Sequence, residues 1–141
     1  MEKADTPNPS TLATRLATAL ALVAHGLPNV FDESTDYFHG FSAELDAQST
    51  LSPEAFKLAL KIGAGYHVDF RPGDDFFAAA RDYGEPYSSG FALLAKLMNV
   101  SLSELTVAFA RKEGVVRVRM WLFGRFAGGH LVGLKTEATE T

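Results

Sequence analysis

The stretch Met120-Trp121-Leu122-Phe123-Gly124, with Leu131-Val132-Gly133-Leu134 after it, decides the fold of this chain. Both segments are short, dense in apolar residues and typical of buried strands, and Ala127-Gly128-Gly129-His130 between them predicts a turn. The chain then continues through Thr136-Glu137-Ala138-Thr139-Glu140-Thr141, with no basic residue after Lys135. We therefore expect a hairpin followed at once by a short acidic tail, which the last strand holds in a fixed direction.

Upstream of this stretch, apolar and polar residues alternate on both sides of Arg111-Lys112-Glu113-Gly114. The period of two predicts another hairpin, from strands over 105–110 and 115–123. One face of the second strand carries Val116, Val118, Met120 and Leu122, and the other carries Arg117, Arg119, Trp121 and Phe123. Because the second face mixes charged and aromatic residues, we expect either a helix or the Arg stems themselves to cover part of it.

Four helices are expected from start signals followed by apolar residues at helical spacing. The first begins at Asn8-Pro9-Ser10-Thr11 and ends before Gly26 and Pro28. Its inward-facing side is expected to carry Leu12, Leu16, Leu20 and Val23. The second follows Ser52-Pro53-Glu54, and a third opens with Asp74 and Asp75 after a turn at 71–73. Ser88 or Ser89 is expected to cap the fourth. Further strands are predicted at 41–45 and 66–70.

These elements predict an α+β protein in which helices lie on both sides of a mainly antiparallel or mixed sheet. A length of 141 residues fits one domain over 1–141. We expect an uncleaved, cytoplasmic protein, because the first ten residues lack the basic start of a secretory signal. The longest apolar run, 16–24, is far short of the ~20 residues that cross a bilayer.

Composition and charge exclude several classes of function. The absence of cysteine excludes disulfides, a thiolate nucleophile and sulfur-ligated zinc. A formal net charge of −4 disfavours direct binding to nucleic acid. The same sign suits a protein that competes with nucleic acid for a basic, metal-holding cleft, because carboxylates then stand where the substrate offers phosphates.

The histidines and carboxylates do not form a recognised catalytic spacing, so we do not expect an enzyme. His25 is expected at a helix C-terminus and His130 in a solvent-exposed turn. His39 near Asp36 is a candidate metal site, as is the set Asp32, Glu33 and Asp36, although an acidic loop more often faces water. Asp74 and Asp75 are better explained as helix-opening charges, and the glycines near the end do not have phosphate-loop spacing.

The terminal segment resembles the C-terminal end of the nuclease A inhibitor family. The shared frame is an apolar strand followed by Gly124, Gly129, Leu131, Gly133 and Thr136, with Glu140-Thr141 last. In addition, Val30-Phe31-Asp32-Glu33-Ser34 falls where that family carries an acidic loop after its first helix. The resemblance covers about a quarter of the chain closely, and residues 43–105 match only in the order of their elements.

This resemblance implies a three-layer α/β/α sandwich related in shape to the pathogenesis-related type 1 fold. It also implies a 1:1 inhibitor of a sugar-non-specific, metal-dependent DNA and RNA endonuclease, with no cofactor of its own. Thr141 would offer an oxygen to the nuclease's metal ion, usually magnesium. Glu33 and Ser34 would engage the active site, and Glu140 would add negative charge. The alternative is a non-catalytic protein- or ligand-binding module of the same sandwich, suggested by the unmatched middle and by aromatic residues around 83–87.

Overall fold

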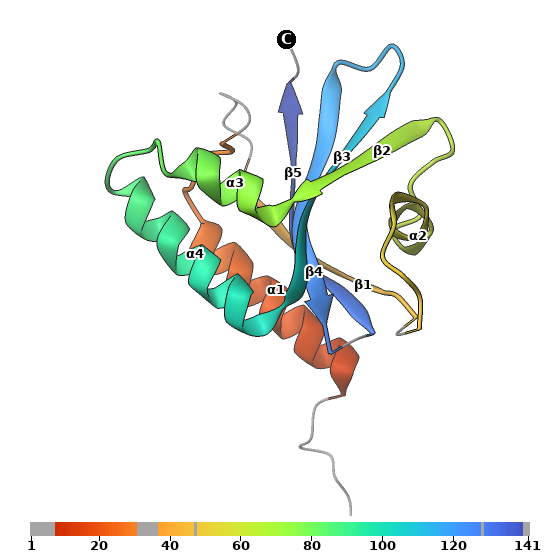
Figure 1. Cartoon of the computed structure of the whole chain (residues 1–141), viewed down its shortest axis with the longest axis horizontal. Coiled ribbons are helices and arrows are strands. Elements are labelled where there is room, and N and C mark those ends of the chain that lie inside the picture. Colours follow the sequence, from red (N-terminus) through yellow and green to blue (C-terminus); the bar gives the residue numbers. More distant parts are fainter. Residues whose placement is uncertain (1–7, 31–36, 47, 128, 140–141) are drawn as a thin grey trace, which may run out of the picture.

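The structure is a computed structural model that describes residues 8–30, 37–46, 48–127 and 129–139, leaving aside the side chains of residues 138 and 139. Its elements follow one another along the chain as shown in Figure 1. They are α1 (Pro9–Ala24), β1 (His39–Glu44), α2 (Pro53–Ala59), β2 (Tyr66–Pro72), α3 (Gly73–Ala80), α4 (Tyr87–Ser101), β3 (Ser103–Lys112), β4 (Arg117–Phe126) and β5 (His130–Thr139).

The strands form one five-stranded sheet in the order β1-β5-β4-β3-β2, and every neighbouring pair is antiparallel. The predicted α+β class is thereby confirmed, as are the two hairpins late in the chain. The strand β4 lies at the centre of the sheet, with β5 and β3 on its two sides. The first strand, β1, joins the sheet only through β5, so the sheet edge depends on contacts between distant parts of the sequence.

One face of the sheet packs against α1, α3 and α4, which Figure 1 shows together on one side. Val118, Met120 and Leu122 of β4 point into this cluster, as their shared face predicts. The helices contribute large side chains that are almost fully buried, including Leu20, Phe76, Phe91, Leu94 and Met98. This is the larger of the two apolar cores.

The opposite face packs against α2, which confirms that a helix covers part of the Arg117-to-Phe123 face. The Phe56 ring lies 4.8 Å from that of Phe123, 5.2 Å from Trp121 and 5.7 Å from Phe70, measured between ring centroids. The helix has only 7 residues. It therefore covers the end of this face near Phe123 and leaves the end near Arg119 uncovered.

The buried stripe of α1 agrees with the predicted one in part. Leu20 is buried, and Leu16 and Val23 pack against the same core, but Leu12 is 41% exposed and the other buried positions are Ala13, Ala17 and Ala24. The reason is a close approach of α1 to β1, in which a Cβ atom at Gly40 would lie 2.4 Å from the Ala17 carbonyl oxygen. Only small side chains fit where a helix and a strand come this close, so alanines line the part of α1 that faces β1.

Three local expectations are also wrong. β2 passes directly into α3, without a separate turn at 71–73. No described side chain caps α4, and the hydroxyls of Ser88 and Ser89 instead donate hydrogen bonds to Glu85, just before the helix. Finally, β5 continues to Thr139, so most of the expected acidic tail is a strand paired with β4.

Candidate functional site

The four residues that the resemblance assigns to nuclease contact, Glu33, Ser34, Glu140 and Thr141, lie outside the described residues, as do Asp32 and Asp36. The structure does describe where these two segments join the fold. β1 and β5 are antiparallel, with His39 opposite Lys135. The start of β1 therefore lies beside the end of β5, and both segments attach at the same end of the sheet (Figure 1).

One carboxylate of the expected tail is held by its own fold. Glu137 lies in β5 opposite Arg119, and its carboxylate accepts a hydrogen bond of 2.8 Å from the Arg117 guanidinium. Both side chains are about half exposed, so the ion pair is at the surface. Glu137 is thus not part of a projecting tail, because strand pairing extends beyond it.

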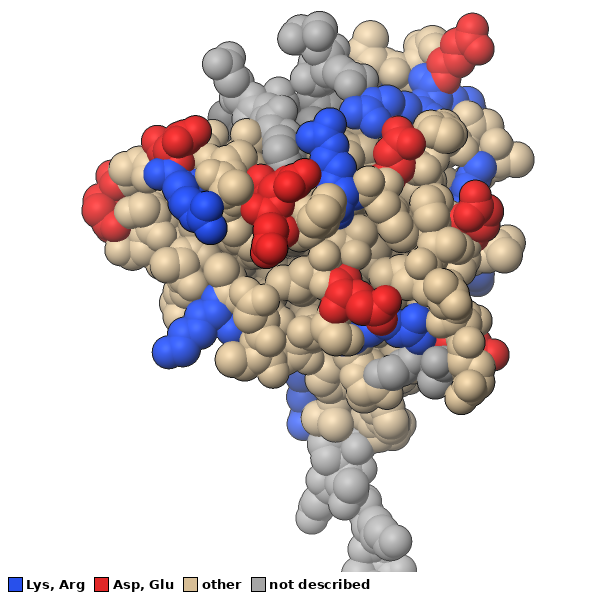
Figure 2. Space-filling model, viewed as in Figure 1, with Lys and Arg blue, Asp and Glu red and all other residues tan. Residues whose placement is uncertain are grey.

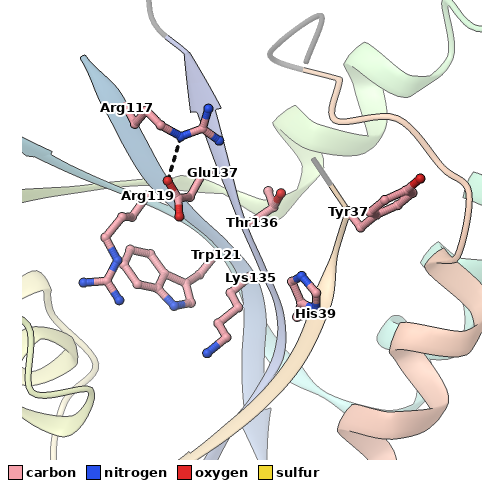
Figure 3. A pocket seen from close by; sticks show the side chains of 8 residues that line it. All are labelled: Tyr37, His39, Arg117, Arg119, Trp121, Lys135, Thr136 and Glu137. Carbon is pink, nitrogen blue, oxygen red and sulfur yellow. Dashed lines mark hydrogen bonds and ion pairs between the residues drawn. The ribbon is translucent and has the colours of Figure 1, made fainter. Parts of the chain in front are cut away.

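A recess of about 450 Å³ opens at this same end of the sheet, beside the start of β1. We call it the β1–β5 recess, and Figure 3 shows the side chains that line it, from Tyr37, His39, Arg117, Arg119, Trp121, Lys135, Thr136 and Glu137. The pairing register explains most of this set. Trp121 and His39 both lie opposite Lys135, and Arg119 lies opposite Glu137. These side chains alternate onto the α2 face of three adjacent strands, beyond the part that α2 covers.

Two cations of the recess have no ion pair among the described residues, Arg119 and Lys135. The Arg119 guanidinium lies over two rings, 5.0 Å from the Trp121 centroid and 5.7 Å from Tyr66. Because Trp121 is almost fully buried, it is a rigid platform for this cation. Figure 2 shows further Lys and Arg side chains, interspersed with Asp and Glu, over the end of the sheet that carries β2, β3 and β4.

The rest of the lining is polar or aromatic. The Thr136 hydroxyl is buried and has no hydrogen-bond partner among the described residues. Tyr37 is 64% exposed, and its ring stacks on that of His25 at a centroid distance of 6.4 Å and an interplanar angle of 12°. Two cations and an exposed ring at the rim together form a site suited to an anion. The alternation of Arg117 and Arg119 with Trp121 was its sequence signal, but the pairing of β1 with β5 was not foreseen.

The remaining histidines do not form a second site. His130 is buried, and its Nε2 lies 3.2 Å from the Ser10 hydroxyl oxygen of α1, so the expected exposed turn is wrong. His67 is exposed on β2, and its Nε2 atom lies 2.9 Å from the Oδ1 atom of Asp69. Asp74 and Asp75 lie in the first turn of α3, as predicted. The described residues include no group of three or more His, Asp or Glu side chains that could hold a metal ion.

Within the described ranges, no helix combines the length and the apolar character needed to cross a membrane. No family model matches the chain, and no curated protein is significantly similar to it.

Proposed function

We propose that the protein is a cytoplasmic 1:1 inhibitor of a sugar-non-specific, metal-dependent DNA and RNA endonuclease, with the three-layer sandwich of the nuclease A inhibitor family. The observation that supports this proposal is the antiparallel pairing of β1 with β5. It brings the attachment points of the loop that contains Glu33 and Ser34 and of the segment Glu140-Thr141 to one end of the sheet. The two sequence signals for inhibition were far apart in the chain, yet their anchors are neighbours.

The anchoring of the C-terminal segment is also favourable. β5 pairs with the central strand β4 as far as Arg117 opposite Thr139, so the last described residue belongs to the sheet. Residues that follow directly on such a rigidly held strand lose little conformational entropy on docking.

The proposed mechanism is occlusion without turnover. Magnesium is a hard cation that takes oxygen ligands and ordinarily meets substrate phosphate in a nuclease. Thr141 supplies an oxygen to that metal ion, which belongs to the nuclease, while Glu33 with Ser34 and Glu140 meet the basic groups around it. The net charge of −4 favours encounter with a basic cleft. The inhibitor itself needs no cofactor.

Deletion of Glu140 and Thr141 tests this proposal. Inhibition of a purified nuclease of this class is measured as the rate of DNA cleavage at increasing inhibitor concentration. We expect the deletion to raise the inhibition constant at least ~100-fold, equivalent to the loss of about 3 kcal/mol of binding free energy. Glu33→Gln is expected to weaken inhibition as well.

The matched control is Glu54→Gln, which removes one negative charge from the exposed first turn of α2. It should leave inhibition unchanged, and circular dichroism should show that all variants are folded. Equal inhibition by the full chain and the truncated chain would exclude the proposed mechanism.

A further inference from the structure

We propose that the β1–β5 recess is a binding site for a small phosphomonoester that carries a flat ring, with nucleoside monophosphates as the representative class. This proposal does not depend on nuclease inhibition, because it rests on Tyr37, just before β1, and on Arg119 of β4 and Lys135 of β5, to which the resemblance assigns no nuclease contact.

The first argument is the charge of the recess. Arg119 lies opposite Glu137 on β4 and β5, and Lys135 is therefore its diagonal neighbour, ~7–8 Å away on the same face. Figure 3 shows both cationic ends on the side of the sheet that carries the Trp121 indole. Glu137 is the one described carboxylate of the lining, and its charge is balanced by Arg117 at 2.8 Å. Among the described residues, the charges of Arg119 and Lys135 therefore remain uncompensated.

The second argument separates a phosphate from a carboxylate. A phosphomonoester carries close to two negative charges at pH 7 and three strong acceptor oxygens. It can therefore pair with both Arg119 and Lys135. A single carboxylate carries one charge and would leave one of the two cations unpaired. The donors of the recess thus match a phosphomonoester better.

The third argument concerns the size of the ligand and its ring. A volume of about 450 Å³ lies within the range of ~300–1,000 Å³ that is usual for small-molecule sites. Tyr37 lies at the recess two residues before His39, which pairs with Lys135. Its exposed ring can stack a planar group while the phosphate meets the cations. A polynucleotide is disfavoured, since the net charge of −4 repels a long phosphate backbone.

Isothermal titration calorimetry with adenosine 5′-monophosphate tests the proposal, with adenosine, inorganic phosphate and a single-stranded DNA oligonucleotide as comparison ligands. We expect adenosine 5′-monophosphate to bind at least tenfold more tightly than adenosine or inorganic phosphate. Lys135→Gln is expected to weaken its binding at least tenfold. Tyr37→Ala should weaken binding of the nucleotide but not that of inorganic phosphate.

The matched control is Lys96→Gln, because Lys96 is an exposed lysine on α4 and does not line the recess. It should bind like the unchanged protein. As an independent test, adenosine 5′-monophosphate is added to the unchanged protein, and the amide chemical shifts of residues 37–39 and 135–137 are expected to change. This measurement needs no substitution. Equal affinity for adenosine and its monophosphate, no loss with Lys135→Gln, tighter binding of the oligonucleotide, or shifts confined to other residues would each overturn the proposal. All of these measurements are made without a nuclease, so a failure of inhibition leaves them unaffected.

Discussion

Gly133 is the residue at which the terminal hairpin is most sensitive to a side chain. It lies in β5 opposite Phe123, and a Cβ atom there would lie 2.1 Å from the Leu122 carbonyl oxygen. Because the clash is with backbone of the central strand, no side-chain rotation relieves it. We expect Gly133→Ala to lower the free energy of unfolding by at least about 2 kcal/mol.

Urea denaturation measures this effect, with Gly63→Ala as the control. A Cβ atom at Gly63 would meet no atom within 4 Å, so this change should stay within ~0.5 kcal/mol of the unchanged protein. Equal unfolding midpoints for the two alanine variants would show that β5 can move away from β4 at little cost.

Glu85 carries the pH dependence that the described residues predict. Hydrogen bonds donated by the Ser88 hydroxyl, and by that of Ser89 at 2.7 Å, lower the pKa of its carboxyl below the ordinary value of 4.5. Because the folded-state pKa is depressed, this contribution to stability is present above the ordinary pKa and is lost as the pH falls through the folded-state pKa.

We expect the double change Ser88→Ala and Ser89→Ala to raise the pKa of Glu85 toward its ordinary value. Carboxyl chemical shifts followed by NMR from pH 2 to pH 7 measure it directly. A Glu85 pKa that is the same with and without the two hydroxyls would refute the assigned cause.

At the scale of elements, α2 shows how a short helix depends on a single ring. It has 7 residues, too few for an isolated helix to be stable in water, and the Ser52 hydroxyl oxygen caps it by accepting a hydrogen bond from the Ala55 amide. Its fully buried residue, Phe56, packs on Trp121 and Phe123. We expect Phe56→Ala to cost about 3–5 kcal/mol of unfolding free energy.

Leu58→Ala is the matched control, because Leu58 lies on the same helix and is 81% exposed. Thermal denaturation measures the melting temperature of both variants. Phe56→Ala should lower it strongly, and Leu58→Ala should hardly change it. Similar losses from the two changes would mean that α2 contributes through helix propensity and not through its docked ring.

At the scale of the whole molecule, two apolar clusters lie on opposite faces of one sheet and share its strands. Neither cluster can therefore lose its packing without exposing the strands that support the other. Trp121, the single tryptophan, lies in the α2 cluster, whereas the two longest helices, α1 and α4, belong to the other. We expect tryptophan fluorescence and far-ultraviolet circular dichroism to report the same urea midpoint, and separate midpoints would show that the two faces unfold independently.

Local signals in the sequence were sufficient for the elements themselves. The cap at Asn8, which accepts a hydrogen bond from the Thr11 amide, the cap at Ser52 and the two late hairpins all follow from residues close together in the chain. The alternation in β4 also predicted which of its faces holds Met120 and which holds Trp121. Such features depend on backbone preferences and period, which neighbouring residues determine.

Only the tertiary structure decided which distant segments become neighbours. The pairing of His39 with Lys135 creates the recess and brings the two attachment points together, and the packing of Ser10 against His130 buries a histidine that was expected in solvent. The stripe of alanines on α1 likewise follows from its close approach to Gly40. These contacts depend on how helices and strands fit in space, and a period of 2 or 3.6 along one segment does not contain that information.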